Sequence, residues 1–489
     1  MRRLTAAIAP GLNRPIQILQ FGEGNFLRAF VDYMVDVANE AGKLNAGIVL
    51  VKPIPYGGLE RFHEQDCRYT VLLRGMENNK PVQHTRLITS VQDAVDAYSE
   101  YDKYAAFARL DTLRFIVSNT TEAGIVLDSE DKLEYCPPHS YPGKLTKFLY
   151  ERAQHFHFDT QKGLIILPVE LIDDNGIHLK QCVQSLARQW NLGDRFTSWL
   201  EDACVFTSTL VDRIVTGYPQ KDAQAVWQTL GYEDQLLVAA EPFGLWVIES
   251  QKDISAEFPL GACGLPVLFT DNQKPYKQRK VRILNGAHTS FVPAAFLCGH
   301  DIVKQAMADP LIRKFILDTL ENEVIPTLSL PKDDLVSFAA AVISRFENPF
   351  IEHALLSISL NSVSKWRARC LPSFLAYFES TGKLPAHLTF SLAALMALYQ
   401  GSRIENGALI CERAGIPYAI LDDETVLTFF AEHSALPAER QAALFLRNEK
   451  FWGQDLSLIP GLVSAVAKDL AAIRMNGMRV TMGEIFPQG

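Results

Sequence analysis

The pattern of apolar and polar positions near the start of the chain predicts a strand, a glycine turn and a helix. The run 16–21 is apolar, Gly22-Glu23-Gly24 follows it, and residues 25–40 carry apolar side chains at helical spacing. A second apolar run at 46–51 then closes a unit of about the ~30 residues that a βαβ motif needs. The beginning of the chain is therefore expected to form a βαβ unit.

The same alternation continues over roughly the first half of the chain. Further strand candidates lie at 69–73, 113–118 and 164–169, and segments such as 91–109 between them show helical periodicity. This order predicts a Rossmann-like, doubly wound and mostly parallel sheet of the α/β class.

Beyond about Gln273 the pattern becomes mainly helical. Apolar residues recur at helical spacing in five segments, 302–320, 334–346, 389–399, 426–433 and 437–446. We therefore expect two domains, a dinucleotide-binding domain over 1–273 and a mainly α-helical substrate domain over 274–489, with a cleft between them.

Composition is that of an ordinary soluble protein, which we expect to lie in the cytoplasm with its cysteines as reduced thiols. The 489 residues are 48% hydrophobic and 21% charged, and the formal charge of -9 offers no general attraction for nucleic acid or an anionic membrane. The eight cysteines are scattered and form no close pair for zinc or disulfide exchange. The longest apolar run, 388–399, is short of the ~20 residues of a membrane span. We expect no nucleic-acid or membrane partner and no metal site.

The glycine turn is a candidate dinucleotide site. Gly22 permits a tight turn and Gly24 a close backbone approach to a pyrophosphate, but Leu27 stands where a full fingerprint has glycine or alanine. Any strand-to-helix turn of an α/β protein is an equally good interpretation. The residues expected to contact the cofactor are Phe21, Gly22, Glu23, Gly24, Asn25, Lys52 and Thr120.

The type of nicotinamide cofactor stays open at this point. The second strand usually ends in an acidic residue that binds the ribose hydroxyls of NAD, whereas here it ends in Lys52. Lys52 either favours the 2′-phosphate of NADP or is an ordinary solvated lysine at a strand end.

The stretch 277–289 is the strongest candidate for catalysis. On an unbroken helix Lys280, Asn285 and His288 fall at about 0°, 140° and 80°, so one face can present all three, although the rise of about 12 Å over eight residues requires Lys280 to reach forward. Reduction of a ketone needs a proton donor and a polarising donor at the oxygen, and no metal is strictly required. Lys280 beside other cations is a suitable acid, Asn285 a suitable amide donor, and His288 can orient substrate. By spacing alone, a solvated basic face and a core histidine are the commoner interpretations.

These residues resemble the lysine, leucine-asparagine-glycine, histidine signature of the long-chain mannitol dehydrogenase family. The match is Lys280-Val281-Arg282-Ile283-Leu284-Asn285-Gly286-Ala287-His288. The resemblance implies a lysine general base, assisted by Asn285 and His288, with no catalytic metal. It also implies the two-domain fold and the use of NAD despite Lys52.

The resemblance extends to the uronate-reducing branch of that family. Segments that carry it are QFGEGNFLRAFVDY at 20–33, SNTTEAG at 118–124, LVDRIVTGYP at 210–219, EPFGLWVIE at 241–249 and SRFENPFIEH at 344–353. It implies the reduction of a sugar acid, tagaturonate, to altronate with NADH. The resemblance further implies substrate contacts by Glu122, Asp212 and Lys365.

A uronate carries a carboxylate, for which a cation is the natural partner. Lys365 is a candidate, and Arg345, Arg367 and Arg369 compete with it, although helix-surface charge is the commoner role of each. In the mannitol-type pattern an asparagine follows the fourth strand, where this chain has Glu170-Leu171-Ile172-Asp173-Asp174-Asn175-Gly176, and a polyol-binding arginine aligns with Ser357. Asn175 is a substitute for that asparagine or a turn residue.

Two groups of alternatives remain. A fructuronate reductase or a polyol dehydrogenase would share the fold and the lysine and differ in substrate stereochemistry or terminal group. A nucleotide-binding module without redox activity, such as a methyltransferase, would have no use for the lysine, asparagine and histidine set. The sequence leaves the oligomeric state and the preferred epimer open.

Overall fold

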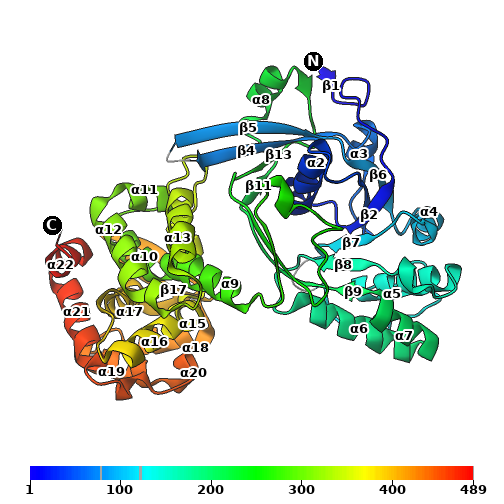
Figure 1. Cartoon of the computed structure of the whole chain (residues 1–489). Coiled ribbons are helices and arrows are strands. Elements are labelled where there is room, and N and C mark those ends of the chain that lie inside the picture. Colours follow the sequence, from blue (N-terminus) through cyan, green and yellow to red (C-terminus); the bar gives the residue numbers. More distant parts are fainter. Residues whose placement is uncertain (78–79, 121–123, 488–489) are drawn as a thin grey trace. The chain divides into compact units, whose positions relative to one another are not determined.

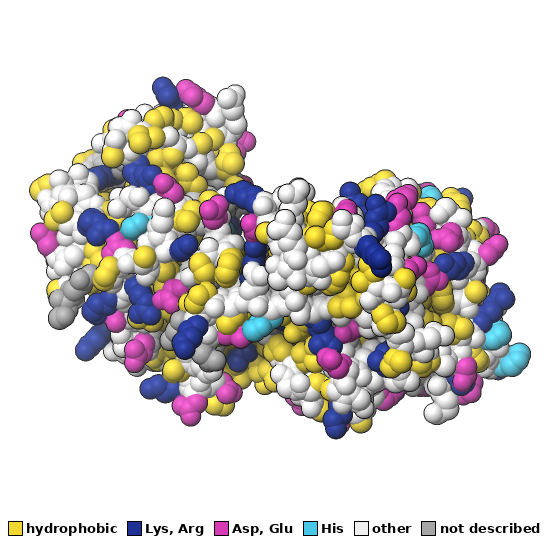
Figure 2. Space-filling view, turned by 90° about the horizontal axis from the view of Figure 1, so that it is seen from above, with side chains coloured by type: hydrophobic (Ala, Val, Ile, Leu, Met, Phe, Trp, Pro, Cys, Tyr) yellow, Lys and Arg dark blue, Asp and Glu magenta, His cyan; other side chains and the backbone are white. Residues whose placement is uncertain are grey.

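The computed structural model describes residues 1–77, 80–120 and 124–487 and divides into two compact units. The sheet unit comprises Met1–Gly75 and Val82–Gln273, and the helical unit comprises Met76–Pro81 and Lys274–Gly489. Over the described ranges, no helix combines the length and the apolar character needed to cross a membrane. On the face shown in Figure 2, basic and acidic side chains are interspersed.

A six-stranded parallel sheet forms the centre of the sheet unit (Figure 1). Its strands follow one another in the Rossmann order, in which the sheet's own first strand, β2, lies in the middle. From edge to edge they are β6 (Val91–Asp96), β3 (Gly47–Lys52), β2 (Ile16–Phe21), β7 (Phe115–Ser118), β8 (Ile165–Pro168) and β9 (Val205–Phe206).

The strands β3, β7 and β8 are almost continuously apolar because both faces of the sheet are covered. Alternate residues enter two separate cores: Ile18 packs in one and Leu19 in the other. The helix α2 (Tyr33–Glu40) covers the first face. The second face is covered by α4 (Tyr101–Ala106), α5 (Tyr141–His155), α6 (Asn175–Gln189) and α7 (Asp194–Ala203). The doubly wound α/β fold predicted from the sequence is confirmed.

Two smaller sheets complete the first core. The order β11-β13-β4-β5 joins Val215–Gly217, Val238–Ala240, Tyr69–Glu77 and Lys80–Ile88. The order β10-β14-β15 joins Ser208–Asp212, Leu245–Glu249 and Val267–Thr270. The remaining elements of this unit are β1 (Arg2–Arg3), β12 (Tyr232–Glu233), α3 (Glu60–Glu64) and α8 (Ala223–Leu230).

Two details differ from the sequence prediction. The strand expected at 69–73 belongs to a smaller sheet and not to the parallel one. The segment 91–109, expected to be helical, begins with β6, the edge strand of the parallel sheet. Val91, Ala94 and Val95 are the buried residues of β6, and their spacing of three and four imitates helical periodicity.

The second unit is mainly helical, as predicted. Its helices are α9 (Lys274–Arg279), α10 (Gly286–Leu297), α11 (Val303–Ala308), α12 (Pro310–Asp318), α13 (Lys332–Phe346), α14 (Leu355–Ile358), α15 (Ser362–Arg369), α16 (Leu371–Thr381), α17 (Ala386–Leu398), α18 (Glu424–His433), α19 (Ala438–Arg447), α20 (Glu449–Trp452), α21 (Leu462–Asn476) and α22 (Met478–Ile485). A three-stranded sheet that the sequence analysis missed lies between α17 and α18, formed by β16 (Gly401–Glu405), β17 (Ala408–Arg413) and β18 (Ile416–Ile420).

The helix α17 explains the longest apolar run of the chain. Every residue from Leu388 to Leu398 is buried. A helix that is apolar on all sides belongs in a protein core, and this one is packed by α10 and α21.

Candidate active site

The glycine turn after β2 has the geometry that the cofactor prediction requires. Gly22 has φ +121°, and a Cβ on it would lie 3.1 Å from the Asn119 carbonyl oxygen and 3.2 Å from Leu27 Cδ1. Backbone and side chain therefore both exclude a larger residue at position 22. The bulky Leu27 is tolerated because it packs, buried, against the turn itself.

The helix that follows the turn offers free amides at its start. Gly24 is the N-cap with extended backbone and no side-chain cap, and a Cβ on it would meet nothing within 4 Å. The helix continues from Asn25 to Glu40 through α1 (Asn25–Leu27), a π-helical segment η1 (Arg28–Asp32) and α2. An uncapped helix start beside a glycine is suited to a pyrophosphate.

Two side chains of the predicted cofactor set support this turn. Phe21 is buried and packs against Tyr141, with ring centroids 5.1 Å apart. Asn25 Oδ1 accepts a hydrogen bond of 2.6 Å from Arg28, whose guanidinium is also bonded to the Leu236 carbonyl. These contacts hold the turn in place from inside the sheet unit.

Lys52 is a buried, paired residue and not a solvated one. Only 1% of its side chain is exposed, and its Nζ lies 3.1 Å from the Asp96 carboxylate and 2.8 Å from the Ile54 carbonyl oxygen. Burial also raises the pKa of the neighbouring Glu23, while Lys52 and Arg28 oppose that rise. The expectation of a solvated lysine is wrong because its partner comes from the next strand of the sheet.

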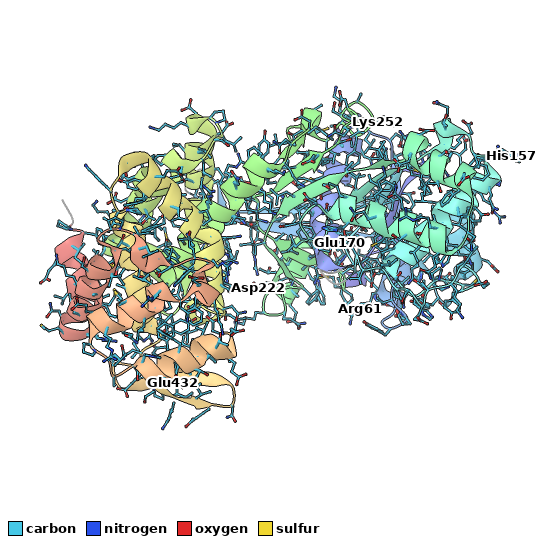
Figure 3. The ribbon with its side chains drawn as sticks, turned by 90° about the horizontal axis from the view of Figure 1, so that it is seen from below. Arg61, His157, Glu170, Asp222, Lys252 and Glu432 are labelled. Atoms are coloured by element: carbon cyan, nitrogen blue, oxygen red, sulfur yellow. The ribbon has the colours of Figure 1, made fainter. Side chains whose placement is uncertain are left out.

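Thr120 is bound to a buried carboxylate that sequence reasoning did not single out. Glu170 Oε1 accepts hydrogen bonds of 3.0 Å from both the backbone N–H and the hydroxyl of Thr120, and Oε2 accepts one of 3.1 Å from Ser118. In Figure 3, Glu170 lies inside the sheet unit, whereas the labelled His157 lies at its periphery. Burial raises the pKa of Glu170.

A cavity opens at the carboxyl ends of β3 and β7. Its volume is about 430 Å³, and Ile54, Thr120 and Tyr141 are among its lining residues. Ligands of doubly wound sheets bind outside the carboxyl ends of the strands, at the point where the strand order reverses. Here that point lies between β2 and β7, so the cavity and the glycine turn occupy the expected place.

Two predicted substrate residues of the sheet unit are buried. Asn175 donates through Nδ2 to the carbonyl oxygens of Pro168, Glu170 and Thr209, and its Oδ1 accepts from the backbone N–H of Gly176 and of Thr209. The backbone thus occupies both of its polar atoms, which favours the structural interpretation. Asp212 ends β10. Glu122 lies outside the described residues.

The candidate catalytic residues share one helical run in the second unit. Lys280 and Asn285 are the first and last residues of a π-helical segment, η5, and His288 lies in α10 directly after it. In a π-helix residues five apart are linked by the hydrogen-bond pattern, so Asn285 comes nearly above Lys280, closer than the 140° of an α-helix would allow. Lys280 and Asn285 are half-buried.

The basic run around Lys280 is not a solvated face. Arg279 is buried, with its guanidinium 4.4 Å from the Phe338 ring centroid. Arg282 donates a 3.3 Å hydrogen bond to the Thr327 carbonyl oxygen. Packing of these cations against protein favours a site over a solvent-facing helix surface.

His288 is held as a neutral imidazole. Its ring stacks on Phe346 at 4.1 Å and meets the edge of His353 at 5.5 Å. Its Nε2 is enclosed and has no hydrogen-bond partner among the described residues. Burial, and then the nearby His353, Arg345, Arg369 and Lys365, lower the pKa of His288 well below its usual value.

The predicted substrate cations divide into two groups. Arg345, Lys365 and Arg369 all lie close enough to His288 to act on its charge. Arg367 is exposed on α15, and its guanidinium lies beside Gly453. The structure therefore gathers Lys280, Asn285, His288, Arg345 and Lys365 in the helical unit and the cofactor residues in the sheet unit.

Comparison with known proteins identifies both halves of the chain. Residues 16–260 match the mannitol dehydrogenase Rossmann domain and residues 272–474 match the mannitol dehydrogenase C-terminal domain. The chain is 46% identical over 489 residues to an altronate oxidoreductase of Pectobacterium carotovorum, covering 99% of each chain. It is 44% identical over 489 residues to an altronate oxidoreductase of Yersinia enterocolitica, again covering 99% of each.

Solved structures agree on the fold. A D-sorbitol dehydrogenase in substrate-free form superposes with a TM-score of 0.79 at 20% identity, covering 99% of this chain and 100% of the other. The Pseudomonas fluorescens mannitol 2-dehydrogenase, in ternary complex with NAD and D-mannitol, gives 0.65 at 20% identity, covering 98% and 95%. The chain therefore belongs to the mannitol dehydrogenase family and is an oxidoreductase that acts on a CH–OH group.

Proposed function

We propose that the protein is an NAD-dependent reductase that converts tagaturonate to altronate, a step in hexuronate breakdown. The relatives of 44–46% identity that span the whole chain are named altronate oxidoreductases. The observation that carries the mechanism is the helical run that holds Lys280, Asn285 and His288 together.

The sheet unit supports NAD in preference to NADP. Lys52 is already paired with Asp96 and with two backbone carbonyl groups, so its charge is used inside the protein. Asp96 and Glu23 would add negative charge near a 2′-phosphate, whereas a carboxylate can accept hydrogen bonds from ribose hydroxyls. Gly22 and Gly24 would hold the pyrophosphate against the helix start.

The helical unit supplies the acid–base chemistry. A bound nicotinamide supplies the hydride. Lys280 donates a proton to the ketone oxygen as charge develops there, and Asn285 donates an amide N–H to the same oxygen. The neutral His288 imidazole carries one N–H and one lone pair, so it can orient a substrate hydroxyl without adding charge. This scheme requires no metal ion.

We place this reaction in the cytoplasm, with a small sugar acid as the partner and without nucleic acid or membrane. All eight cysteines are free thiols, as expected for a protein of a reducing compartment.

Parallel assays with NADH test the proposal. Tagaturonate, fructuronate, fructose and tagatose are offered at equal concentration while NADH absorbance is followed, and the reverse reaction is run with altronate, mannonate and mannitol. We expect the highest kcat/KM with tagaturonate and altronate. Higher activity with fructuronate or a neutral ketose would show that tagaturonate is not the preferred substrate. NADH fluorescence that neither changes in intensity nor shifts at millimolar cofactor would contradict the proposed redox function.

A further inference from the structure

A cluster of cations surrounds His288 in the helical unit. This basic cluster consists of Arg345 on α13, His353 in the loop after it, and Lys365 and Arg369 on α15. Its members come from three segments of the chain, and α15 packs against both α10 and η5, the elements that carry the candidate catalytic residues. The cluster therefore lies beside the chemistry of the proposed reaction.

Two cations of the cluster share one face of α15. Lys365 and Arg369 are four residues apart, so their side chains lie one above the other along the helix. Trp366 on the same helix is fully buried in the core, and Arg367 is exposed elsewhere, beside Gly453. The helix thus directs one cationic pair towards His288 and one unrelated arginine away from it.

Hydrogen bonds to neutral groups fix this cationic pair. Lys365 Nζ donates a 3.0 Å hydrogen bond to the Ile358 carbonyl oxygen, and Arg369 donates one of 3.4 Å to the Thr289 hydroxyl. Within the described ranges neither lies within 4.0 Å of a carboxylate oxygen. Asp422, whose charge raises the pKa of Lys365, already accepts hydrogen bonds from Tyr399 and Val363.

The positive charge of the pair is therefore incompletely balanced. Both side chains are half-buried. Burial lowers the pKa of Lys365, with Arg369 as the second cause, and burial also lowers the pKa of Arg369. A partly desolvated pair of like charges is stabilised when an anion enters between its members.

We infer that Arg369, acting with Lys365, binds the carboxylate of the substrate and so selects a sugar acid over the corresponding neutral sugar. This assignment rests on the proposed function, because it uses tagaturonate as the substrate. An arginine can grip a carboxylate through two N–H groups, while the lysine contributes a point charge. The other members of the cluster are not assigned to the carboxylate. Arg345 precedes Phe346, whose ring stacks on His288, and the His353 ring itself packs against His288.

The test compares a charged with a neutral substrate in matched variants. Tagatose carries a hydroxymethyl group where tagaturonate carries the carboxylate. Arg369→Gln is expected to lower kcat/KM for tagaturonate by about 10- to 100-fold. This factor corresponds to the free energy lost with one hydrogen bond between charged groups. The loss for tagatose is expected to be much smaller, and Arg369→Lys is expected to recover part of the activity.

Arg367→Gln is the matched control, because this residue lies two positions away on the same helix and is exposed. It is expected to keep wild-type rates with both sugars. The affinity for NADH, measured by fluorescence, is expected to stay unchanged in every variant. Equal losses for tagaturonate and tagatose in Arg369→Gln, or a larger loss of NADH affinity than of uronate selectivity, would overturn the assignment.

Binding of the product separates this inference from the proposed function. Calorimetry compares altronate with altritol, its neutral counterpart, in the presence of NAD. We expect the wild-type protein to prefer altronate and Lys365→Met and Arg369→Gln to lose that preference while their unfolding midpoints stay near that of the wild type. If the wild-type protein prefers altronate but does not reduce tagaturonate, the proposed activity is wrong and the carboxylate site is supported. If the wild-type protein binds altronate and altritol equally well, the carboxylate site is wrong.

Discussion

A buried acid beneath the cofactor turn gives a measurable prediction for stability. Asp32 is fully buried, and its Oδ2 accepts a 2.5 Å hydrogen bond from Tyr69. Its Oδ1 and the neighbouring Gln20 Oε1 are both enclosed acceptors without a hydrogen-bond donor among the described residues. A proton on Asp32 would supply the missing donor. Gln20 also donates to the Gly22 carbonyl oxygen at 3.2 Å, so this pair supports the glycine turn.

Burial raises the pKa of Asp32 from 3.8 to about 7, despite the opposing effects of Tyr69 and Arg28. The folded protein therefore holds this proton more tightly than the unfolded chain. Its stabilising effect is complete below about pH 4 and is lost as the pH rises to about 7. At about 1.4 kcal/mol per pH unit, the loss amounts to about 4 kcal/mol of unfolding free energy.

The variant Asp32→Asn tests this reasoning, because asparagine imitates the protonated acid and can donate to Gln20 and accept from Tyr69. Urea unfolding is followed by tryptophan fluorescence between pH 4 and 8, with the exposed Asp271→Asn as control. Trp246 reports on this region, since its ring lies 5.5 Å from that of Phe30 in the same core. We expect the variant to gain stability over the wild type as the pH rises, approaching the full difference near pH 8. A variant that is less stable than the wild type at pH 8 would show that the ionised carboxylate is the native form.

Three further predictions concern the candidate site. Lys280→Ala should lower kcat by about 10²- to 10⁴-fold, the usual contribution of a general acid, and leave the NADH dissociation constant unchanged; near-normal turnover would exclude Lys280. His288→Asn should lower activity without changing the shape of the kcat–pH profile between about pH 6 and 8, because burial keeps the pKa of His288 far below its usual value; disappearance of an ionisation from the profile would contradict this. Asp96→Asn should free Lys52 to contact a 2′-phosphate. The ratio of kcat/KM for NADPH to that for NADH should then rise by about tenfold or more, the effect of one charge-assisted contact. An unchanged ratio would show that the Lys52–Asp96 ion pair does not determine cofactor choice.

Much of the fold could be predicted because its signals are local. The strand β2, its glycine turn and the helix after it differ in periodicity and are adjacent in sequence, and α17 is recognisable from its unbroken apolar run. Strand β6 was missed because its buried residues Ala94 and Val95 follow Val91 by three and four positions, as on a helix. The sheet β16–β18 was missed although Asn406-Gly407, both with positive φ, joins its first two strands in the typical two-residue turn.

The site was less accessible to sequence reasoning because its partners are distant along the chain. Lys52 takes its counter-ion from Asp96 across the sheet, and Thr120 is bound to Glu170, which follows another strand. No spacing rule connects His288 with His353 or Arg369. The candidate residues themselves came from a motif, whereas the electrostatic state of His288 depends on the packed helices around it.

The π-helical segment from Lys280 to Asn285 has a consequence for evolution and engineering. Such a segment holds one residue more than the α-helical turn that would replace it. Removing one residue between Lys280 and Asn285 would leave them four apart in an α-helix, at about 40°, whereas winding the unchanged segment as an α-helix would set them at about 140°. A substitution that straightens this segment into an α-helix without a deletion should therefore turn the amine away from the amide, although every chemically important side chain is still present.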